Sequence, residues 1–264
     1  MGRVGRALVW HELVERTRDR WVVAISILFA LLASAVGLYG RSAEADVAKL
    51  TGPSLVTLAS LLVPLVALVL SHDAIVGERE RNTLGLLFSL PVSRLEVVIA
   101  KFLGRSLALA LAVGLGLGAA ALVSDPASAR TLLALVMPTL LLGLAFLSLG
   151  ILISSATRRQ VTAASVVVVV WFALVFFYDL GLLGMLVISD GGVSESTVSA
   201  LVVGNPAGLY RVQMMHIFAG PEVLADLGLR TGLPSAATTW AIWGAWLVIP
   251  VLISGAILSR RKVA

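Results

Sequence analysis

Residues 71–105 read SHDAIVGERE RNTLGLLFSL PVSRLEVVIA KFLGR, a charged island between two long apolar runs. Its centre holds four consecutive charged residues, Glu78, Arg79, Glu80 and Arg81. One charged side chain at the centre of a membrane helix costs about 2.5–3.5 kcal/mol on insertion scales. We therefore expect the island to lie in water or against a soluble partner, and the runs on either side of it to lie in lipid.

The composition is that of an integral membrane protein. Of the 264 residues, 59% are hydrophobic and 13% are charged, whereas soluble proteins average about 25% charged residues. The mean hydropathy of +1.00 comes from runs that are long enough to cross a bilayer as helices, which takes about 20 residues. We predict an all-α integral membrane protein that forms one transmembrane domain, residues 1–264. The absence of cysteine excludes disulfides, thiolate metal sites and cysteine nucleophiles.

One interfacial helix and six transmembrane helices are expected. In residues 1–20, Trp10 and Leu13 fall on one face of a helix and Glu12 and Arg16 on the other. This pattern favours an amphipathic helix in the membrane interface, and the alternative is a charged cytosolic extension of the first span. The spans are expected at residues 21–40, 53–70, 102–123, 131–153, 161–188 and 239–258.

The distribution of lysine and arginine predicts the orientation in the membrane. Fifteen of the 20 Lys and Arg residues fall in the N-terminal segment, the island, the turn after the fourth span and the C-terminal tail. Because six spans put these segments on one side, and because positive residues mark the cytoplasmic side, we predict that both termini are cytoplasmic. Residues 71–101 then form a cytoplasmic segment, and residues 189–238 form an outer segment.

Few ionisable side chains are expected near the membrane interior. Asp179 lies about 27 Å along the fifth span at 1.5 Å per residue, near the outer interface. We interpret it as a gate or, more simply, as an outer-rim charge paired with Arg211 or with water. His72 and Asp73 fall at the cytoplasmic mouth of the second span, where a solvated helix end is favoured over a path for protons.

Motifs for catalysis and metal binding are missing from the sequence. It has no G-x-x-x-x-G-K-[ST] phosphate-binding loop and no H-E-x-x-H zinc motif, so an enzyme is not predicted. A secondary transporter would usually carry charges or broken helices at the membrane midplane, and these spans hold almost none. Met214, Met215 and His216 are soft ligands suited to cuprous ion, but packing explains adjacent methionines equally well, and no metal site is predicted.

The island resembles the signature of the permease subunits of type II ABC exporters. The run ERERNTLGLL (residues 78–87), followed by Pro91, Arg94 and Lys101, carries that likeness. The family commonly has Gly before the threonine, whereas this chain has Asn82, which also tolerates tight turns. The resemblance implies the type II ABC exporter permease fold. It also implies contact with a cytoplasmic ATPase through Glu78, Arg79, Glu80, Arg81, Thr83 and Leu84.

Within that family, the whole length resembles permeases of the copper-associated complexes that mature nitrous oxide reductase. The narrower likeness rests on Arg20-Trp21, on residues 73–78, on the pair Asn205-Pro206 and on the triplet Leu209-Tyr210-Arg211. It implies a homodimer in the bacterial inner membrane that binds two cytoplasmic ATPases, which use ATP and Mg. Lipid would be a further partner, nucleic acid would not, and this chain itself would bind no cofactor.

The same likeness implies that ATP hydrolysis is coupled to assembly of the copper sites of periplasmic nitrous oxide reductase. A periplasmic β-helical copper-handling protein would sit on the outer face and would contact Asn205, Pro206, Tyr210 and Arg211. A sulfur species, cuprous ion or no cargo at all would be compatible with spans this apolar. The alternatives are a type II ABC permease for another small substrate and a secondary transporter.

Overall fold

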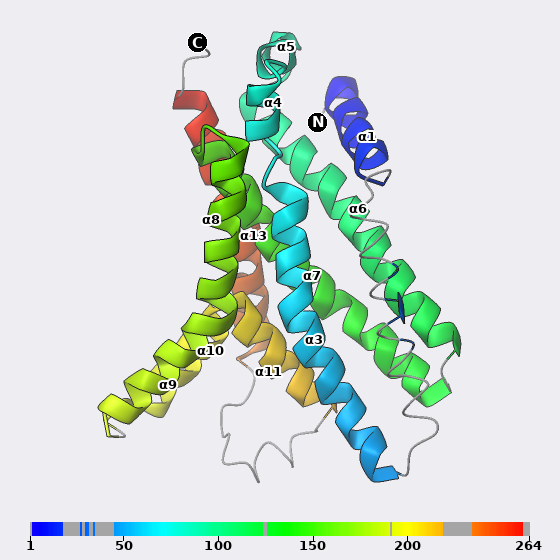
Figure 1. The fold of residues 1–264 in the computed structure, drawn as a ribbon, viewed down its shortest axis with the longest axis vertical. Coiled ribbons are helices and arrows are strands. Elements are labelled where there is room, and N and C mark those ends of the chain that lie inside the picture. The colour runs from blue at the N-terminus through cyan, green and yellow to red at the C-terminus, as the bar shows by residue number, and fades with distance from the viewer. Residues whose placement is uncertain are drawn as a thin grey trace.

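The computed structural model describes residues 2–17, 27, 30–31, 34, 45–123, 126–190, 192–218 and 234–260, and these are almost entirely helical (Figure 1). No strand occurs among them. The elements are α1 (Arg3–Thr17), α3 (Ala45–Ser71), α4 (Val76–Glu80), α5 (Leu84–Ser89), α6 (Arg94–Val123), α7 (Pro126–Ala156), α8 (Gln160–Phe172), the π-helical turn η1 (Ala173–Phe177), α9 (Tyr178–Ile188), α10 (Glu195–Gly204), α11 (Pro206–Phe218) and α13 (Ala236–Arg260).

Five helical stretches are long and apolar enough to cross a membrane. They are Val56–Glu80, Arg94–Leu122, Leu132–Ala156, Gln160–Ile188 and Ala236–Arg260. These stretches coincide with the second to sixth predicted spans, and the all-α membrane fold is confirmed. The first predicted span, residues 21–40, lies almost wholly outside the described residues.

The third span begins earlier than the hydropathy predicts, at Arg94 instead of residue 102. A capping box explains the start: Glu96 Oε2 accepts from the backbone N–H of Ser93 at 2.9 Å, and Ser93 Oγ accepts from the backbone N–H of Glu96 at 3.2 Å. This reciprocal pair satisfies amide groups that a helix N-terminus leaves free. The end of the predicted segment 71–101 is therefore helical.

The core of the bundle lies around α7, which packs against α3, α6 and α13. Leu142, Phe146 and Ile151 of α7 are fully buried. Glycine lets the neighbouring helices approach closely, because a Cβ added at Gly150 would lie 1.9 Å from Ser71 Oγ. Close contact through small residues is the usual basis of helix association in lipid.

The fifth span differs from the others in both shape and burial. It consists of α8, η1 and α9, and it turns away from the bundle at η1, so that α9 projects outward (Figure 1). Only 11% of its most apolar stretch is buried, against 33–67% in the other four stretches. Most of this span therefore faces lipid or a partner and not the rest of the chain.

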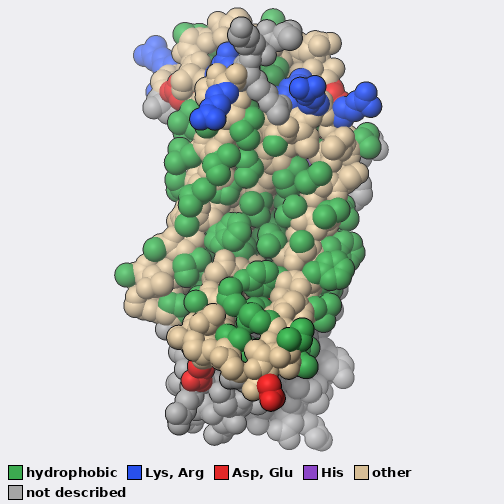
Figure 2. Space-filling view, turned by 90° about the vertical axis from the view of Figure 1, so that its left-hand side faces the viewer, with side chains coloured by type: hydrophobic (Ala, Val, Ile, Leu, Met, Phe, Trp, Pro, Cys, Tyr) green, Lys and Arg blue, Asp and Glu red, His purple; other side chains and the backbone are tan. Residues whose placement is uncertain are grey.

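The two ends of the bundle differ in charge. The described ends of α1 and α13 lie at the end that carries α4 and α5, and α10 and α11 lie towards the other end (Figure 1). Lys and Arg side chains gather at the α4–α5 end on the face that Figure 2 shows. This is the arrangement expected for a cytoplasmic end. The orientation itself stays a prediction.

The N-terminal helix α1 packs along α6 with the face that was predicted to be polar. Trp10 is 67% exposed, whereas Glu12 and Arg16 are buried. An interfacial helix directs its charged face to water, and that part of the prediction is wrong. The reason is that α6 presents cations to Glu12, and Gly104 of α6 leaves room for the backbone of α1: an added Cβ would lie 2.5 Å from Glu12 Cβ and 2.9 Å from the Val9 carbonyl oxygen.

We predict that Gly104→Ala weakens the packing of α1 against α6. The added methyl meets backbone and Cβ atoms that cannot move independently, and overpacking of this kind costs about 1–3 kcal/mol. Gly114→Ala on the same helix is the matched control, since a Cβ there meets nothing within 4 Å. Thermal melts of the purified protein should show a lower Tm for Gly104→Ala alone. Equal melting temperatures for the two variants would contradict the close approach of α1.

Candidate functional site

The predicted coupling segment, residues 71–101, folds into two short helices joined by a tight turn. Helix α4 ends at Glu80, and Asn82, two residues further on, has a φ of 57° in the left-handed region. The Thr83 N–H donates to the Glu78 carbonyl at 2.9 Å and the Asn82 N–H to the Arg79 carbonyl at 3.2 Å, which is the Schellman arrangement of a helix C-terminus. Asn82 therefore occupies a position that favours glycine, in agreement with the tight turn inferred from the sequence.

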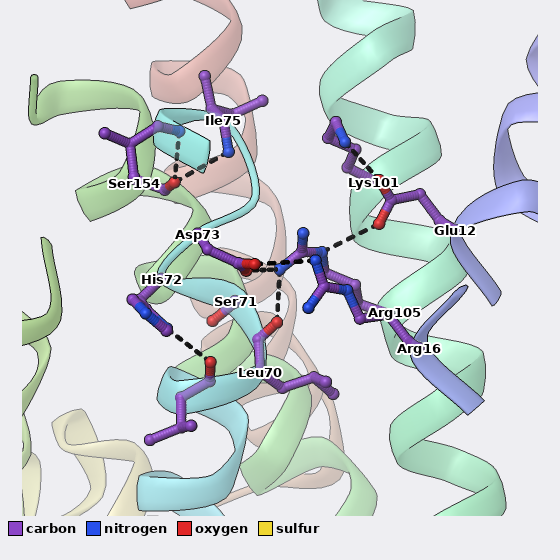
Figure 3. A network of polar contacts seen from close by, with 12 residues as sticks. Glu12, Arg16, Leu70, Ser71, His72, Asp73, Ile75, Lys101, Arg105 and Ser154 are labelled. Atoms are coloured by element: carbon purple, nitrogen blue, oxygen red, sulfur yellow. Dashed lines mark hydrogen bonds and ion pairs between the residues drawn. The ribbon is translucent and has the colours of Figure 1, made fainter. Parts of the chain in front are cut away.

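Three contacts hold the ends of this segment on the bundle. Ser154 Oγ of α7 accepts from the backbone N–H groups of Ile75 and Val76, at 2.9 and 3.0 Å, where α4 begins (Figure 3). At the other end, Arg94 donates to the carbonyl of Leu258 in α13 at 2.5 Å. The segment is therefore attached to the fourth and sixth spans.

Behind the coupling segment lies a buried cluster of ion pairs that joins α1, α4, α6 and the turn after α3 (Figure 3). It contains three acids and three bases, so its formal charge is zero. We call this group the charge cluster: Glu12, Arg16, Asp73, Glu78, Lys101 and Arg105.

Arg105 is the centre of the charge cluster, and its side chain is 1% exposed. Its guanidinium donates to Asp73 Oδ1 at 2.6 Å, to Glu12 Oε2 at 3.2 Å and to the Leu70 carbonyl at 2.5 Å. The planar fork of arginine suits such a set of acceptors, which a lysine ammonium cannot reach together. Arg105 therefore ties the N-terminal helix and the end of the second span to the third span.

Two further cations complete the charge cluster. Arg16 Nη2 donates to Asp73 Oδ2 at 2.9 Å. Lys101 donates to Glu12 and, at 2.9 Å, to Glu78 Oε1. The interpretation of Asp73 as a solvated helix end is wrong, because two arginines from other helices enclose its carboxylate.

The charge cluster changes the titration of Glu12, which lies outside the spans. Burial raises the pKa of the Glu12 carboxyl, but the charges of Arg105 and Lys101 outweigh it, and the pKa falls below its ordinary value of 4.5. Glu12 is therefore ionised at neutral pH, and its charge is matched within the protein. A buried carboxylate of this kind stabilises the fold only while it stays ionised.

Of the four charged residues predicted to contact an ATPase, three have side chains that are hydrogen-bonded within the chain. Glu78 pairs with Lys101 and accepts from the Thr83 hydroxyl, Arg79 donates to the Thr157 carbonyl, and Glu80 Oε1 accepts from the backbone N–H of Gln160 at 2.8 Å. These contacts lie at the base of the segment. Contact of Glu78, Arg79 and Glu80 with an ATPase stays a prediction.

The exposed part of the coupling segment is its outer end. Arg81 has a side chain that is 59% exposed, and its contact with Glu15 is 3.9 Å long. Leu84 is partly buried against the core, whereas Leu86, which the sequence analysis did not single out, is 69% exposed. Helix α5, which carries Leu86, therefore offers the most accessible apolar surface of the segment.

At the outer end, the pair predicted between Asp179 and Arg211 is present. Arg211 donates to both carboxylate oxygens of Asp179, to Oδ1 at 2.9 Å. A role for Asp179 as a gate stays a prediction. Asn205, Pro206 and Tyr210, which were predicted to contact a periplasmic partner, are buried in the chain. Of the four residues, only Arg211 offers surface to a partner in this structure.

The soft side chains of α11 do not converge on one point. Met214 is fully buried and Met215 is 37% exposed, so their thioethers face different surroundings. His216 Nε2 is buried and has no hydrogen-bond partner among the described residues. The part of the chain that the structure describes contains no group of three or more His, Asp or Glu side chains placed to hold a metal ion.

The charge cluster was not found by sequence reasoning. Glu12 and Arg16 lie four residues apart, and so do Lys101 and Arg105, which places each pair on one face of a helix. Two charges on the same face of an apolar helix must find partners within the protein. That spacing was the available signal, but it does not say which helices meet.

Comparison with known proteins gives a likeness over the whole chain. Residues 6–263 match the family described as "ABC-2 family transporter protein". The chain is 36% identical, over 281 aligned residues, to the "Probable ABC transporter permease protein NosY" of Pseudomonas aeruginosa, with 97% of this chain and 99% of that protein covered. A protein of the same name from Stutzerimonas stutzeri is 36% identical over 271 residues, with 96% of this chain and 98% of that protein covered.

We predict that Arg105→Met strongly destabilises the protein, because it leaves Asp73 and Glu12 with fewer cations in a buried setting. Removing one partner of a buried ion pair costs about 3–5 kcal/mol. Arg105→Lys keeps the charge but loses the fork, so its Tm should fall between those of the native protein and Arg105→Met. Thermal melts of the purified protein provide the measurement, and a native Tm for Arg105→Met would contradict the proposed importance of the charge cluster.

The lowered pKa of Glu12 predicts a defined pH dependence. Because the folded-state pKa lies below the ordinary value of 4.5, the stability that Glu12 contributes is fully present above pH 4.5. It is lost as the pH falls through the folded-state pKa. The difference in Tm between native protein and Glu12→Gln should therefore be constant near neutral pH and shrink below pH 4.5. A difference that grows on acidification would contradict the pairing of an ionised Glu12.

Proposed function

We propose a role for this chain from its membership of the ABC-2 transporter family, in which it is an ABC transporter permease subunit. It couples ATP hydrolysis by partner ATPases to maturation of the copper sites of periplasmic nitrous oxide reductase. The observation that carries the proposal is the whole-length likeness to two permeases named NosY. The chain is the membrane component, and its sequence has no phosphate-binding loop. ATP and Mg would therefore bind to the partner ATPases.

The cytoplasmic end supports this role through helix α5. It lies beyond α4 at the end of the molecule (Figure 1) and exposes Leu86, and the exposed Arg81 lies in the segment just before it. An exposed leucine suits the pocket of a soluble partner, in which it would provide buried area, and Arg81 would help to orient the contact. We propose that two ATPase subunits bind to the α5 surfaces of a homodimer of this chain.

The charge cluster would make the coupling segment move as one body with the helices behind it. Glu78 is paired with Lys101, and the start of α4 is hydrogen-bonded to Ser154. A force applied at α5 therefore acts on α6 and α7 directly and is not absorbed by a mobile loop. This preorganisation is what transmission of an ATPase movement to membrane helices requires.

On the outer face, the proposal places copper on a periplasmic β-helical protein and not on this chain. The described residues contain no cluster of His, Asp and Glu that would hold a metal ion. Of the residues assigned to this contact, Arg211 is partly exposed on α11, and the exposed start of α10, around Glu195, lies on the same outer hairpin. We propose these residues as the contact surface for the periplasmic partner.

Deletion of this gene in the organism that carries it tests the proposal. We expect nitrous oxide reductase isolated from the deletion strain to be depleted in copper, and the native gene to restore the metal content. The variant Leu86→Asp should not restore it, because a carboxylate at the centre of the contact prevents binding of the ATPase, which should no longer copurify. Copper content and the amount of ATPase in the purified complex are the two measurements.

The variant Leu86→Met is the matched control, since it keeps an apolar side chain of similar volume and should behave as the native chain. Fully copper-loaded nitrous oxide reductase in the deletion strain would contradict the maturation role. If the deletion strain gives that result while the ATPase copurifies with the native chain, a permease for another small substrate becomes the better assignment. Normal ATPase content in Leu86→Asp would contradict the role of α5.

A further inference from the structure

We propose that the fifth span works as a lever and that Asn205 is the positioning residue that holds its pivot, the π-helical turn η1. One arm of the lever is α8, which starts beside the coupling segment, and the other is α9, which projects from the outer part of the bundle (Figure 1). The inference rests on the proposed function for its source of movement, the partner ATPases. The geometry of the lever comes from contacts within this chain.

The first step is the backbone of η1, residues Ala173–Phe177. The Tyr178 N–H donates to the carbonyl of Ala173, five residues back, and not to that of Leu174 as in an α-helix. Single π turns inside α-helices are rare, often mark functional sites, and are a recognised cause of sharp bends. The bend of the fifth span therefore has a defined location.

The second step is the partner of the Leu174 carbonyl. Asn205 Nδ2 donates to it at 2.7 Å, and Asn205 Oδ1 accepts from the Ala207 N–H at 3.1 Å. The two contacts fix the orientation of the amide, because a carbonyl needs a donor and an N–H needs an acceptor. Asn205 is 1% exposed, so no water competes for these groups. One side chain thus caps α11 and holds the π turn.

Two more contacts lie within one helical turn of this point. The Tyr178 hydroxyl donates to the Leu201 carbonyl of α10 at 2.8 Å, and Arg211 of α11 pairs with Asp179. Helix α11 itself belongs to the packed core, since it packs against α3 and α7 and buries Tyr210 and Met214. The pivot is therefore attached to the core of the bundle.

The third step concerns the inner arm. Glu80 of α4 accepts from the Gln160 N–H at the first residue of α8, and Arg79 donates to the Thr157 carbonyl in the preceding turn. A carboxylate at a helix N-terminus is favoured by both the free amide and the helix dipole. Displacement of α4 would therefore move the start of α8 with it.

The outer arm is free to move. No residue of α9 is buried, and Ile188 at its end is 87% exposed. Segments with few buried contacts are displaced at little cost in free energy. With the input at Glu80 and the pivot at Asn205, movement of α8 would swing α9 on the outer side, next to the surface proposed for the periplasmic partner.

Distance measurements between spin labels test the lever, and the chain is suited to them because it contains no cysteine. Ile188→Cys reports on the end of α9, and Ala237→Cys reports on the start of α13, both at exposed positions. The complex with its partner ATPases is reconstituted in lipid nanodiscs, with labelled chain diluted by unlabelled chain. Distances are compared without nucleotide and in an ATP-trapped state.

We expect the native complex to show an ATP-dependent shift in this distance and Asn205→Ser to lose it. Serine keeps an oxygen for the Ala207 N–H, but its shorter side chain has a single hydroxyl and cannot also place a donor at the Leu174 carbonyl, which Asn205 Nδ2 reaches in the native chain. ATP hydrolysis and ATPase content should stay at native levels, which a general loss of structure would not allow. Gln213→Leu is the matched control on α11: it removes the 3.2 Å contact with Trp243 Nε1, away from the pivot, and should keep the shift.

An ATP-dependent shift of native size in Asn205→Ser would overturn the proposal. Loss of the shift in Gln213→Leu to the same extent as in Asn205→Ser would also overturn it. If Asn205→Ser does not insert into the membrane, Tyr178→Phe takes its place, since it removes only the hydroxyl contact with Leu201. That variant should show a reduced shift, and an unchanged one would overturn the pivot. Absence of ATPase from the native complex would instead contradict the proposed function.

Discussion

Charges buried in an apolar protein must be matched, and this constraint determines the half of the molecule that carries α1, α4 and α5. Glu12, Asp73 and Glu78 face Arg16, Lys101 and Arg105, and all of these side chains except that of Glu78 have little access to water. An isolated buried charge costs several kcal/mol, and neither lipid nor a void supplies a counter-ion. The third span contributes two cations and the segment after the second span contributes two carboxylates, so each of these elements alone carries unmatched charge, and α1 adds one acid and one base that pair with both. The charge cluster thus favours assembly of these helices with one another, in addition to the stability that its ion pairs contribute.

The same constraint explains why the coupling segment is ordered before any partner binds. Its base is hydrogen-bonded to Ser154 and paired with Lys101, and the turn between its helices is closed through the left-handed conformation of Asn82. Only the outer end, α5, presents free side chains such as Leu86. A partner that binds there meets a surface of fixed shape, so little conformational entropy is lost on binding. The division into a fixed base and an accessible tip suits a segment that transmits force.

Much of this architecture could be predicted from local sequence, and what could not depends on distant pairing. Hydropathy located five of the spans, Asn82 was recognised as compatible with a tight turn, and Arg211 was one of the two partners, with water, that were expected for Asp179 near the outer interface. The charge cluster was missed because its contacts join residues 23 to 93 positions apart, and periodicity within α1 cannot show which face meets α6. The π turn was missed as well, since Ala-Leu-Val-Phe-Phe is equally suited to an α-helix.

The contrast in burial between the fifth span and the rest of the bundle has a physical consequence in a membrane. Apolar side chains gain little by exchanging lipid for protein, because acyl chains are as apolar as leucine. The position of the fifth span is therefore determined less by its apolar surface than by a few directional contacts, at Glu80, Leu174, Tyr178 and Asp179. These contacts act at the start of the span and at its bend, and α9 beyond them is unburied. A helix held in this way can rotate about its bend without exposing apolar surface to water, whereas displacing α7 would break the close contacts of the core. Displacement of the fifth span therefore costs less than displacement of the core helices.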